Sequence, residues 1–255
     1  MNLTPRSESL ARWYEAELHV LFTRLSNPAD RPLPTEEEID DFEPVDADLD
    51  AVIRDHLELH LGAPNGTSHD TRGPVPIDVA LTEPADRRPW GACCTVGASA
   101  RAMPTADADS RDSSRHVELF LRLPKSAFRY WEAVVLEPFD DLFEAVIDAL
   151  GELGRLPHEQ RVGYRTPQIV ATPDMSPLVA GLPFAGVLLR DASTGTVPVP
   201  ELAMPGGGTV TFLTVTFLHP SEIRALSGPD RVRAATRLAK RGVDELLAPE
   251  REPVL

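Results

Sequence analysis

The sequence predicts an α+β fold in which a mixed β-sheet is flanked by helices. Two changes of pattern along the chain indicate this class. Apolar residues recur at helical spacing as far as Leu61, whereas from Val75 onward they alternate with the period of two that is typical of strands. Helical and strand-like patterns then follow one another to the end of the chain. The 255 residues are 42% apolar, which is sufficient for a sizeable core.

Two helical patterns and a proline-rich link occupy the first 62 residues. Ser7 or Ser9 can cap a helix that runs to about Ser26, because apolar residues recur there at every third or fourth position. An acidic turn begins at Thr35. A further helix is predicted from Asp48 to Leu61, where a glycine ends it.

Strand patterns dominate the middle of the chain. Val75 to Leu81 and Trp90 to Val96 predict a hairpin, and His116 to Leu123 alternates as a third strand. Residues 104–115 form a polar loop. Helices are expected in the next two segments, which are Ser126 to Leu136 and Pro138 to Leu153.

The last third predicts further strands and two helices. Arg161 to Ala171 and Phe184 to Leu189 are strand-like, and Thr209 to Leu218 is the strongest strand pattern because it is rich in β-branched and aromatic residues. A glycine-rich turn precedes it. The helices are predicted from His219 to about Ser227 and from Asp230 to Leu247.

Negative charge is concentrated in two parts of the chain. The net charge is −15, and residues 1–62 hold 15 Asp and Glu against five Arg. Residues 131–153 hold seven Asp and Glu and no Lys or Arg, which at helical spacing indicates a solvated face. Such a surface repels phosphate backbones and anionic lipids, so direct binding to nucleic acid or membranes is disfavoured. A basic protein partner is favoured, although acidity also serves solubility alone.

The compartment expected for this chain is the cytoplasm. No run approaches the roughly 20 apolar residues that a membrane span requires. The first 20 residues are too polar and too acidic for a signal peptide. The only cysteines, Cys93 and Cys94, are neighbours, so no disulfide framework is expected.

Candidate catalytic and metal-binding residues are few. Cys93 and Cys94 face opposite sides of a strand, so we expect one in the core, and the sequence leaves the exposure of the other open. An inert buried thiol is favoured over a hydrolase that uses a cysteine with His69. His56 and His60 have the spacing of two zinc ligands on a helix but lack an identifiable third ligand. We therefore predict no enzyme activity, no metal and no cofactor.

Several short, degenerate motifs occur along the chain in the same order as in a known family. The stretch VPIDVALTEPADRRPWGACCTVGASARAM resembles the suppressor of fused (SUFU) family, in which a strand with Asp precedes a strand ending in T-x-G-x-S. HVELFLRLPK is similar to the E-L-x-L-x-L-P strand of that family, and VTFLTVTFLHPSEIRALSG to its late strand and following helix. The resemblance spans roughly residues 49–251. The landmark residues are Asp78, Thr95, Gly97, Ser99 and Glu222.

The resemblance implies a SUFU-like fold and a binding function. Bacterial members resemble immunity proteins of polymorphic toxin systems, so we expect a protein that neutralises a partner toxin with a basic surface. The alternative is a peptide-binding regulator of a transcription or signalling factor that acts by strand addition, as the animal members do. The residues expected to contact the partner are acidic, namely Glu36, Glu37, Glu38, Asp40 and Asp41.

Two units are expected along the chain. Residues 1–47 form an acidic helical extension, and residues 48–255 form the SUFU-like domain. The sequence leaves open whether this domain divides into subdomains at about 48–155 and 156–255, and it does not indicate the oligomeric state.

Overall fold

The computed structural model describes residues 18–23, 25, 47–70, 75–86, 88–104, 116–125, 139–205 and 207–255. Their helices are α3 (Ala47–Leu61), α5 (Phe139–Gln160), α6 (Pro220–Leu226) and α7 (Arg231–Lys240), with the 3₁₀ turns η2 (Ala98–Ala100) and η3 (Ala192–Thr194). The strands are β1 (His19–Phe22), β2 (Gly66–Asp70), β3 (Ile77–Thr82), β4 (Trp90–Val96), β5 (His116–Pro124), β6 (Gln168–Ala171), β7 (Gly186–Asp191), β8 (Leu202–Ala203) and β9 (Thr209–Leu218).

One mixed sheet holds all of these strands. Its order is β1-β6-β7-β9-β5-β4-β3-β2, and β8 pairs with β9 outside this path. The β1–β6 and β5–β9 pairs are parallel, and the other pairs are antiparallel. The predicted α+β class with a mixed sheet is therefore confirmed. The β5–β9 pair joins strands of the first half of the chain to strands of the second half. The division into subdomains at about residue 155 stays a prediction.

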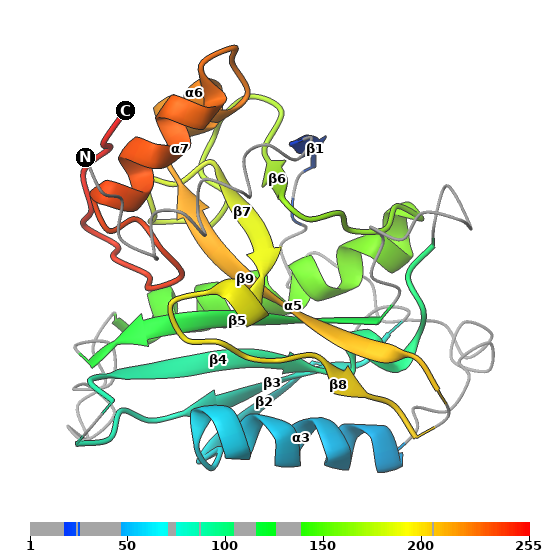
Figure 1. The fold of residues 1–255 in the computed structure, drawn as a ribbon. Helices are drawn as coiled ribbons and strands as arrows, with labels where there is room; N and C mark the ends of the chain where they lie inside the picture. Colours follow the sequence, from blue (N-terminus) through cyan, green and yellow to red (C-terminus); the bar gives the residue numbers. More distant parts are fainter. Residues whose placement is uncertain are drawn as a thin grey trace, which may run out of the picture.

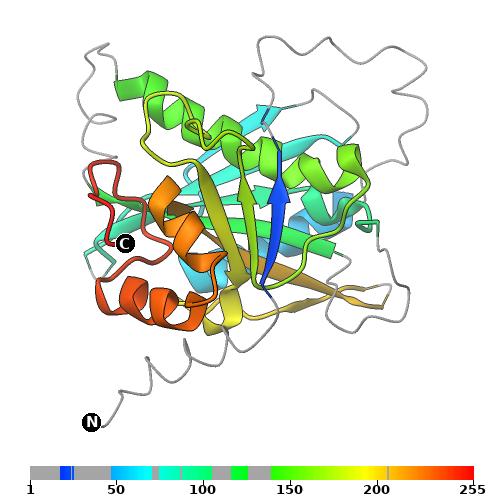
Figure 2. The same ribbon diagram turned by 90° about the horizontal axis from the view of Figure 1, so that it is seen from above.

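Helices cover both faces of the sheet (Figures 1 and 2). The alternation along β9 shows how the cores are divided, since Leu213 and Val215 pack in the core that contains α5. On the opposite face Val210 and Phe212 pack with α3, and Leu218 packs with α6 and α7. Because both faces are covered, the central strands are apolar on both sides.

Most elements with strong local patterns are confirmed. The helix predicted from Asp48 is α3, and the predicted hairpin is the antiparallel β3–β4 pair. The third strand of the middle region is β5, the strongest strand pattern is β9, and the helix that follows it is α6. The helix expected to end at Leu153 is α5, which continues to Gln160.

Three predicted elements differ in the structure. Residues 19–22 form strand β1 rather than the end of a helix, because they pair in parallel with β6. Only residues 168–171 of the strand predicted from Arg161 are strand. The last helix ends at Lys240 instead of Leu247, because the segment that follows packs along β5.

The structure decides one exposure that the sequence left open and corrects another that the sequence predicted. Cys93 and Cys94 are both buried, since α5 covers one face of β4 and α3 covers the other. The acidic face of α5 is exposed at Glu144, but Glu152 is buried and pairs with Arg155 at 2.9 Å.

Some predictions fall outside the described residues. They are most of the helix from Ser7 or Ser9, the acidic turn at Thr35, the loop beyond residue 104, the helix from Ser126 and the whole acidic contact group.

Candidate functional site

Three landmark residues surround the carboxylate of Glu118, which is completely buried in β5. Thr95 Oγ1 donates a hydrogen bond to Glu118 Oε2 at 2.5 Å. The backbone N–H groups of Gly97 and Ser99 donate to Oε1 at 3.1 and 2.9 Å, and Ser99 Oγ donates to the same oxygen at 2.6 Å. The carboxylate thereby connects the end of β4 and the turn η2 to β5.

The local chain path explains how these donors converge. The β4–β5 ladder ends where Cys94 lies opposite Phe120. At the next position the Thr95 hydroxyl accepts a hydrogen bond from the Leu119 N–H at 2.8 Å, so its own hydrogen is free to bond Glu118. Gly97 then has φ +105°, a conformation that favours glycine and turns the backbone into η2.

The electrostatics of this network are unusual because all four donors to Glu118 are neutral. Burial raises the pKa of Glu118 to about 7, and the hydrogen bonds from Ser99, Thr95 and Gly97 act in the opposite direction. His158 Nε2 bonds the carbonyl of Ala98 at 3.2 Å, and burial lowers the pKa of this histidine. A completely buried carboxyl group cannot reach a substrate, so we assign it the role of joining strands.

Asp78 belongs to a separate network that ties α3 to the edge of the sheet. Its Oδ2 forms an ion pair with Nη2 of Arg54, and its Oδ1 lies 2.7 Å from Nδ1 of His69. Arg54 Nη1 also donates to Thr67 Oγ1 at 3.3 Å. The side chains of Arg54 and Asp78 are 30% and 24% exposed, so solvent screens this pair.

Glu222 organises a third network between α6 and the C-terminal segment. The backbone N–H groups of His219 and Val254 donate to its carboxylate at 2.9 and 3.1 Å. Arg251 binds both oxygens, with Nη1 at 2.5 Å and Nη2 at 2.8 Å. Burial raises the pKa of Glu222, but the hydrogen bonds from Arg251, His219 and Val254 and the charge of Arg251 outweigh it and hold the pKa below its ordinary value.

The family model of the suppressor of fused protein (SUFU) matches residues 73–252, which is most of the chain. The chain belongs to the suppressor of fused family. The range that matches contains every landmark residue and all three networks, apart from Arg54, His69, Thr67 and Val254.

Two solved structures share the fold of this suppressor of fused domain. The crystal structure of the Sufu–Fu complex has a TM-score of 0.54 and 14% identity, covering 81% of this chain and 91% of that chain. A SUFU homologue from Neisseria gonorrhoeae FA 1090 has a TM-score of 0.52 and 14% identity, covering 82% of this chain and 97% of that one. No curated protein matches the chain.

The landmark residues of the suppressor of fused domain do not form one site. Thr95, Gly97 and Ser99 meet at Glu118, whereas Asp78 and Glu222 each anchor a different network. Glu118 itself was absent from the predicted site. The sequence feature that could have identified Glu118 is a charged residue within an otherwise apolar strand, because a carboxylate in a strand covered on both faces requires buried hydrogen-bond donors.

The segment after α7 is a further feature that the sequence analysis missed. Glu245 is completely buried, and its carboxylate lies 3.2 Å from Arg122 of β5 and 3.6 Å from Arg190 of β7. The backbone of Arg122 accepts from the Leu247 N–H and donates to the Glu245 carbonyl, both at 2.9 Å. This segment therefore crosses the junction of β5 with the second half of the sheet.

The disfavoured alternative, a hydrolase that uses a cysteine with His69, is not supported by the geometry of the suppressor of fused domain. Burial raises the pKa of both Cys93 and Cys94, which keeps them as thiols, while a nucleophilic cysteine requires the thiolate. The side chain of His69 is 69% exposed on β2 and is engaged by Asp78. These residues form structural contacts rather than a nucleophile and its base.

The helical histidines also have a structural environment. His56 Nε2 lies 2.9 Å from the carbonyl oxygen of Pro200, and its ring stacks on Phe212 with centroids 5.2 Å apart. Within the part of the chain that the structure describes, no group of three His, Cys, Asp or Glu side chains is arranged to hold a metal. Nor is any described helix long and apolar enough to cross a membrane.

Proposed function

We propose that this chain is a non-enzymatic cytoplasmic domain that binds another protein, acting as an immunity protein that neutralises a toxin with a basic surface. The observation that carries the proposal is the concentration of negative charge. The net charge is −15, and residues 1–62 contain 15 Asp and Glu against five Arg. Such a field accelerates association with a basic partner and discriminates against acidic ones.

Helix α3 presents part of this charge to solvent. Ile53 and Leu57 bury the inner face of the helix, whereas Asp55 and Glu58 are exposed on its outer side. Leu59 is 78% exposed beside them. Acidic side chains around an apolar one suit a docking surface, because the charges guide the encounter and the apolar contact stabilises the complex.

The family supports a binding role. The solved Sufu–Fu structure is a complex of two proteins, which favours a protein partner for this chain as well. The polar networks around Glu118 and Glu222 are buried and join elements of the fold, so they fit a rigid binding scaffold better than a catalytic centre.

The first experiment is a pull-down of the tagged full chain from its native cytoplasm at low and high salt, with partners identified by mass spectrometry. A toxin-like protein that is lost as salt rises is the expected result. The double variant Asp55→Lys/Glu58→Lys should reduce the association rate constant about tenfold, because like charges then meet at the interface.

A matched control and a second variant test which surface binds. Glu250→Lys/Glu252→Lys makes the same change of charge at exposed positions after α7 and should leave association unchanged. Charge reversal of Glu36, Glu37 and Glu38 tests the predicted contact group directly. Binding that is insensitive to salt and to both acidic-surface variants would contradict the proposal.

A second function is favoured by the edge of the sheet. Strand β2 (Gly66–Asp70) pairs with β3 and ends the strand order among the described residues. An edge strand of this kind can accept an extended peptide by strand addition, as expected for a regulator of a transcription or signalling factor. Hydrogen exchange of residues 66–70 distinguishes the two functions. New protection of these amides in the complex would indicate strand addition, and unchanged exchange would favour docking on α3.

A further inference from the structure

The groove between α6 and α7 has a charge opposite to that of the chain as a whole. Residues 220–242 contain six Lys and Arg against Glu222 and Asp230. Glu222 is completely buried and is bound by Arg251, so it does not neutralise the groove. Asp230 is the one acidic side chain among the residues that line the groove.

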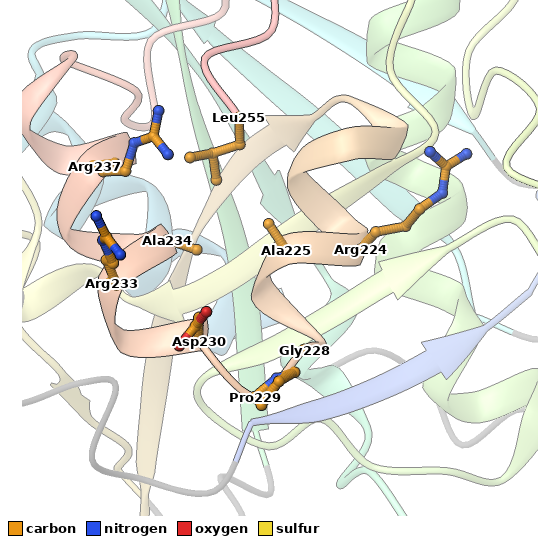
Figure 3. A pocket seen from close by; sticks show the side chains of 9 residues that line it. All are labelled: Arg224, Ala225, Gly228, Pro229, Asp230, Arg233, Ala234, Arg237 and Leu255. Carbon is orange, nitrogen blue, oxygen red and sulfur yellow. The ribbon is translucent and has the colours of Figure 1, made fainter.

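Three arginines line this groove, which has a volume of about 450 Å³. Arg233 and Arg237 lie one turn apart on α7, and Arg224 belongs to α6, with its guanidinium group directed away from α7 (Figure 3). All three are exposed, and among the described residues none of them forms an ion pair.

The floor and edge of the groove are small and apolar. Ala225 and Ala234 lie between the arginine-bearing walls, and the Leu255 side chain lines the same groove (Figure 3). Small residues at the floor allow a backbone to approach closely, while the guanidinium groups of the α7 wall can bind carboxylates in a bidentate manner. This combination fits a short extended segment with acidic side chains.

We propose that the α6–α7 groove binds an acidic peptide segment of a protein partner. The distribution of charge favours a short segment over nucleic acid. Residues 220–242 carry four net positive charges, so the rest of the chain carries −15 − 4 = −19. A long polyanion is repelled by this net charge along its whole length, whereas a short acidic segment carries few charges and can be bound by the groove arginines. This site differs in charge and position from the α3 surface, and it does not depend on the proposed function.

The test is fluorescence anisotropy of the full chain with a labelled peptide of alternating Glu and Gly residues. The double variant Arg233→Glu/Arg237→Glu should weaken binding at least about tenfold, because repulsion replaces two charge-assisted contacts. Arg101→Glu/Lys125→Glu makes the same change of charge at exposed positions outside the groove and should leave binding within about twofold. Circular dichroism confirms that both variants fold. The corresponding Gln–Gly peptide should not bind.

Three results would overturn the proposal. Equal weakening in the groove variant and the control would show a response to net charge rather than a site. Tighter binding of a thymidine oligonucleotide of equal charge would indicate a nucleic-acid site. Self-association that disappears in Arg233→Glu/Arg237→Glu would identify a second copy of the chain as the occupant.

Discussion

Two completely buried carboxylates, Glu118 in β5 and Glu222 in α6, are held in opposite ways. Glu118 accepts hydrogen bonds from hydroxyl and backbone N–H groups, and burial raises its pKa to about 7. Glu222 is bound at both oxygens by Arg251, and its pKa lies below the ordinary value. Hydrogen bonds from neutral donors therefore do not offset desolvation at Glu118, whereas at Glu222 the hydrogen bonds and charge of Arg251, together with two backbone donors, outweigh it.

The largest effect is expected when the Glu222 network loses its cation. Arg251→Met leaves the carboxylate with two backbone donors and should lower the free energy of unfolding by about 3–5 kcal/mol, measured by urea denaturation at pH 7. Arg241→Met, at an exposed position just after α7, should change it by less than about 0.5 kcal/mol. A loss below about 1 kcal/mol at Arg251 would mean that backbone donors hold Glu222 as they hold Glu118.

Replacing Glu118 or Glu222 by Gln tests the comparison of the two carboxylates through the dependence of stability on pH. The folded state binds the Glu118 proton more tightly than the unfolded state does, since burial raises the pKa from 4.5 to about 7. The stability of the wild type relative to Glu118→Gln should therefore decline by about 3 kcal/mol as pH rises through this window, and stay constant above it. Urea denaturation between pH 4 and 8 measures this difference.

Glu222→Gln should give the opposite dependence on pH. Because the folded-state pKa of Glu222 is lowered, its contribution to stability is present above pH 4.5 and is lost as pH falls through the folded-state value. If the stability of the wild type relative to each Gln variant changed with pH in the same direction for both, the proposed difference between the two carboxylates would be wrong.

A smaller effect is expected from a single donor to Glu118. Thr95→Val removes the hydroxyl that bonds both Glu118 and Leu119, and should cost about 1–3 kcal/mol in the free energy of unfolding. The loss should be greater at pH 8 than at pH 5, because the ionised carboxylate depends more on its donors. Thr82→Val is the control, since the buried Thr82 hydroxyl has no hydrogen-bond partner among the described residues. An equal loss at both threonines would indicate packing rather than the network.

The smallest effect is expected at the partly exposed landmark. Asp78→Asn weakens its contacts with Arg54 and His69 and should cost about 0.2–1 kcal/mol, less at high salt. Asp55→Asn changes an exposed acidic residue of α3 and provides the reference for altered net charge. A loss as large as that at Arg251 would show that Asp78 belongs with the buried carboxylates.

Elements with a strong local period were predictable from the sequence. Helix α3, the β3–β4 hairpin and strand β9 have apolar patterns that suit one conformation. The apolar residues of β1 also fit a helical period, and parallel pairing with β6, distant in the sequence, selected the strand. The last helix was overextended in the same way, because residues after Lys240 have better partners in β5 than in continued helix.

The candidate site was predictable only in part. The family resemblance pointed to Thr95, Gly97 and Ser99, which do act together, but it did not reveal that they bind Glu118. Sequence alone determined the α+β class, the local elements, the family motifs and the concentration of negative charge. The tertiary structure decided the strand order, the burial of both cysteines and the partners of each carboxylate. The physical reason is that the period of apolar residues depends only on neighbours in the sequence. The desolvation and hydrogen bonding of a carboxylate depend on groups distant in the sequence that only folding brings together.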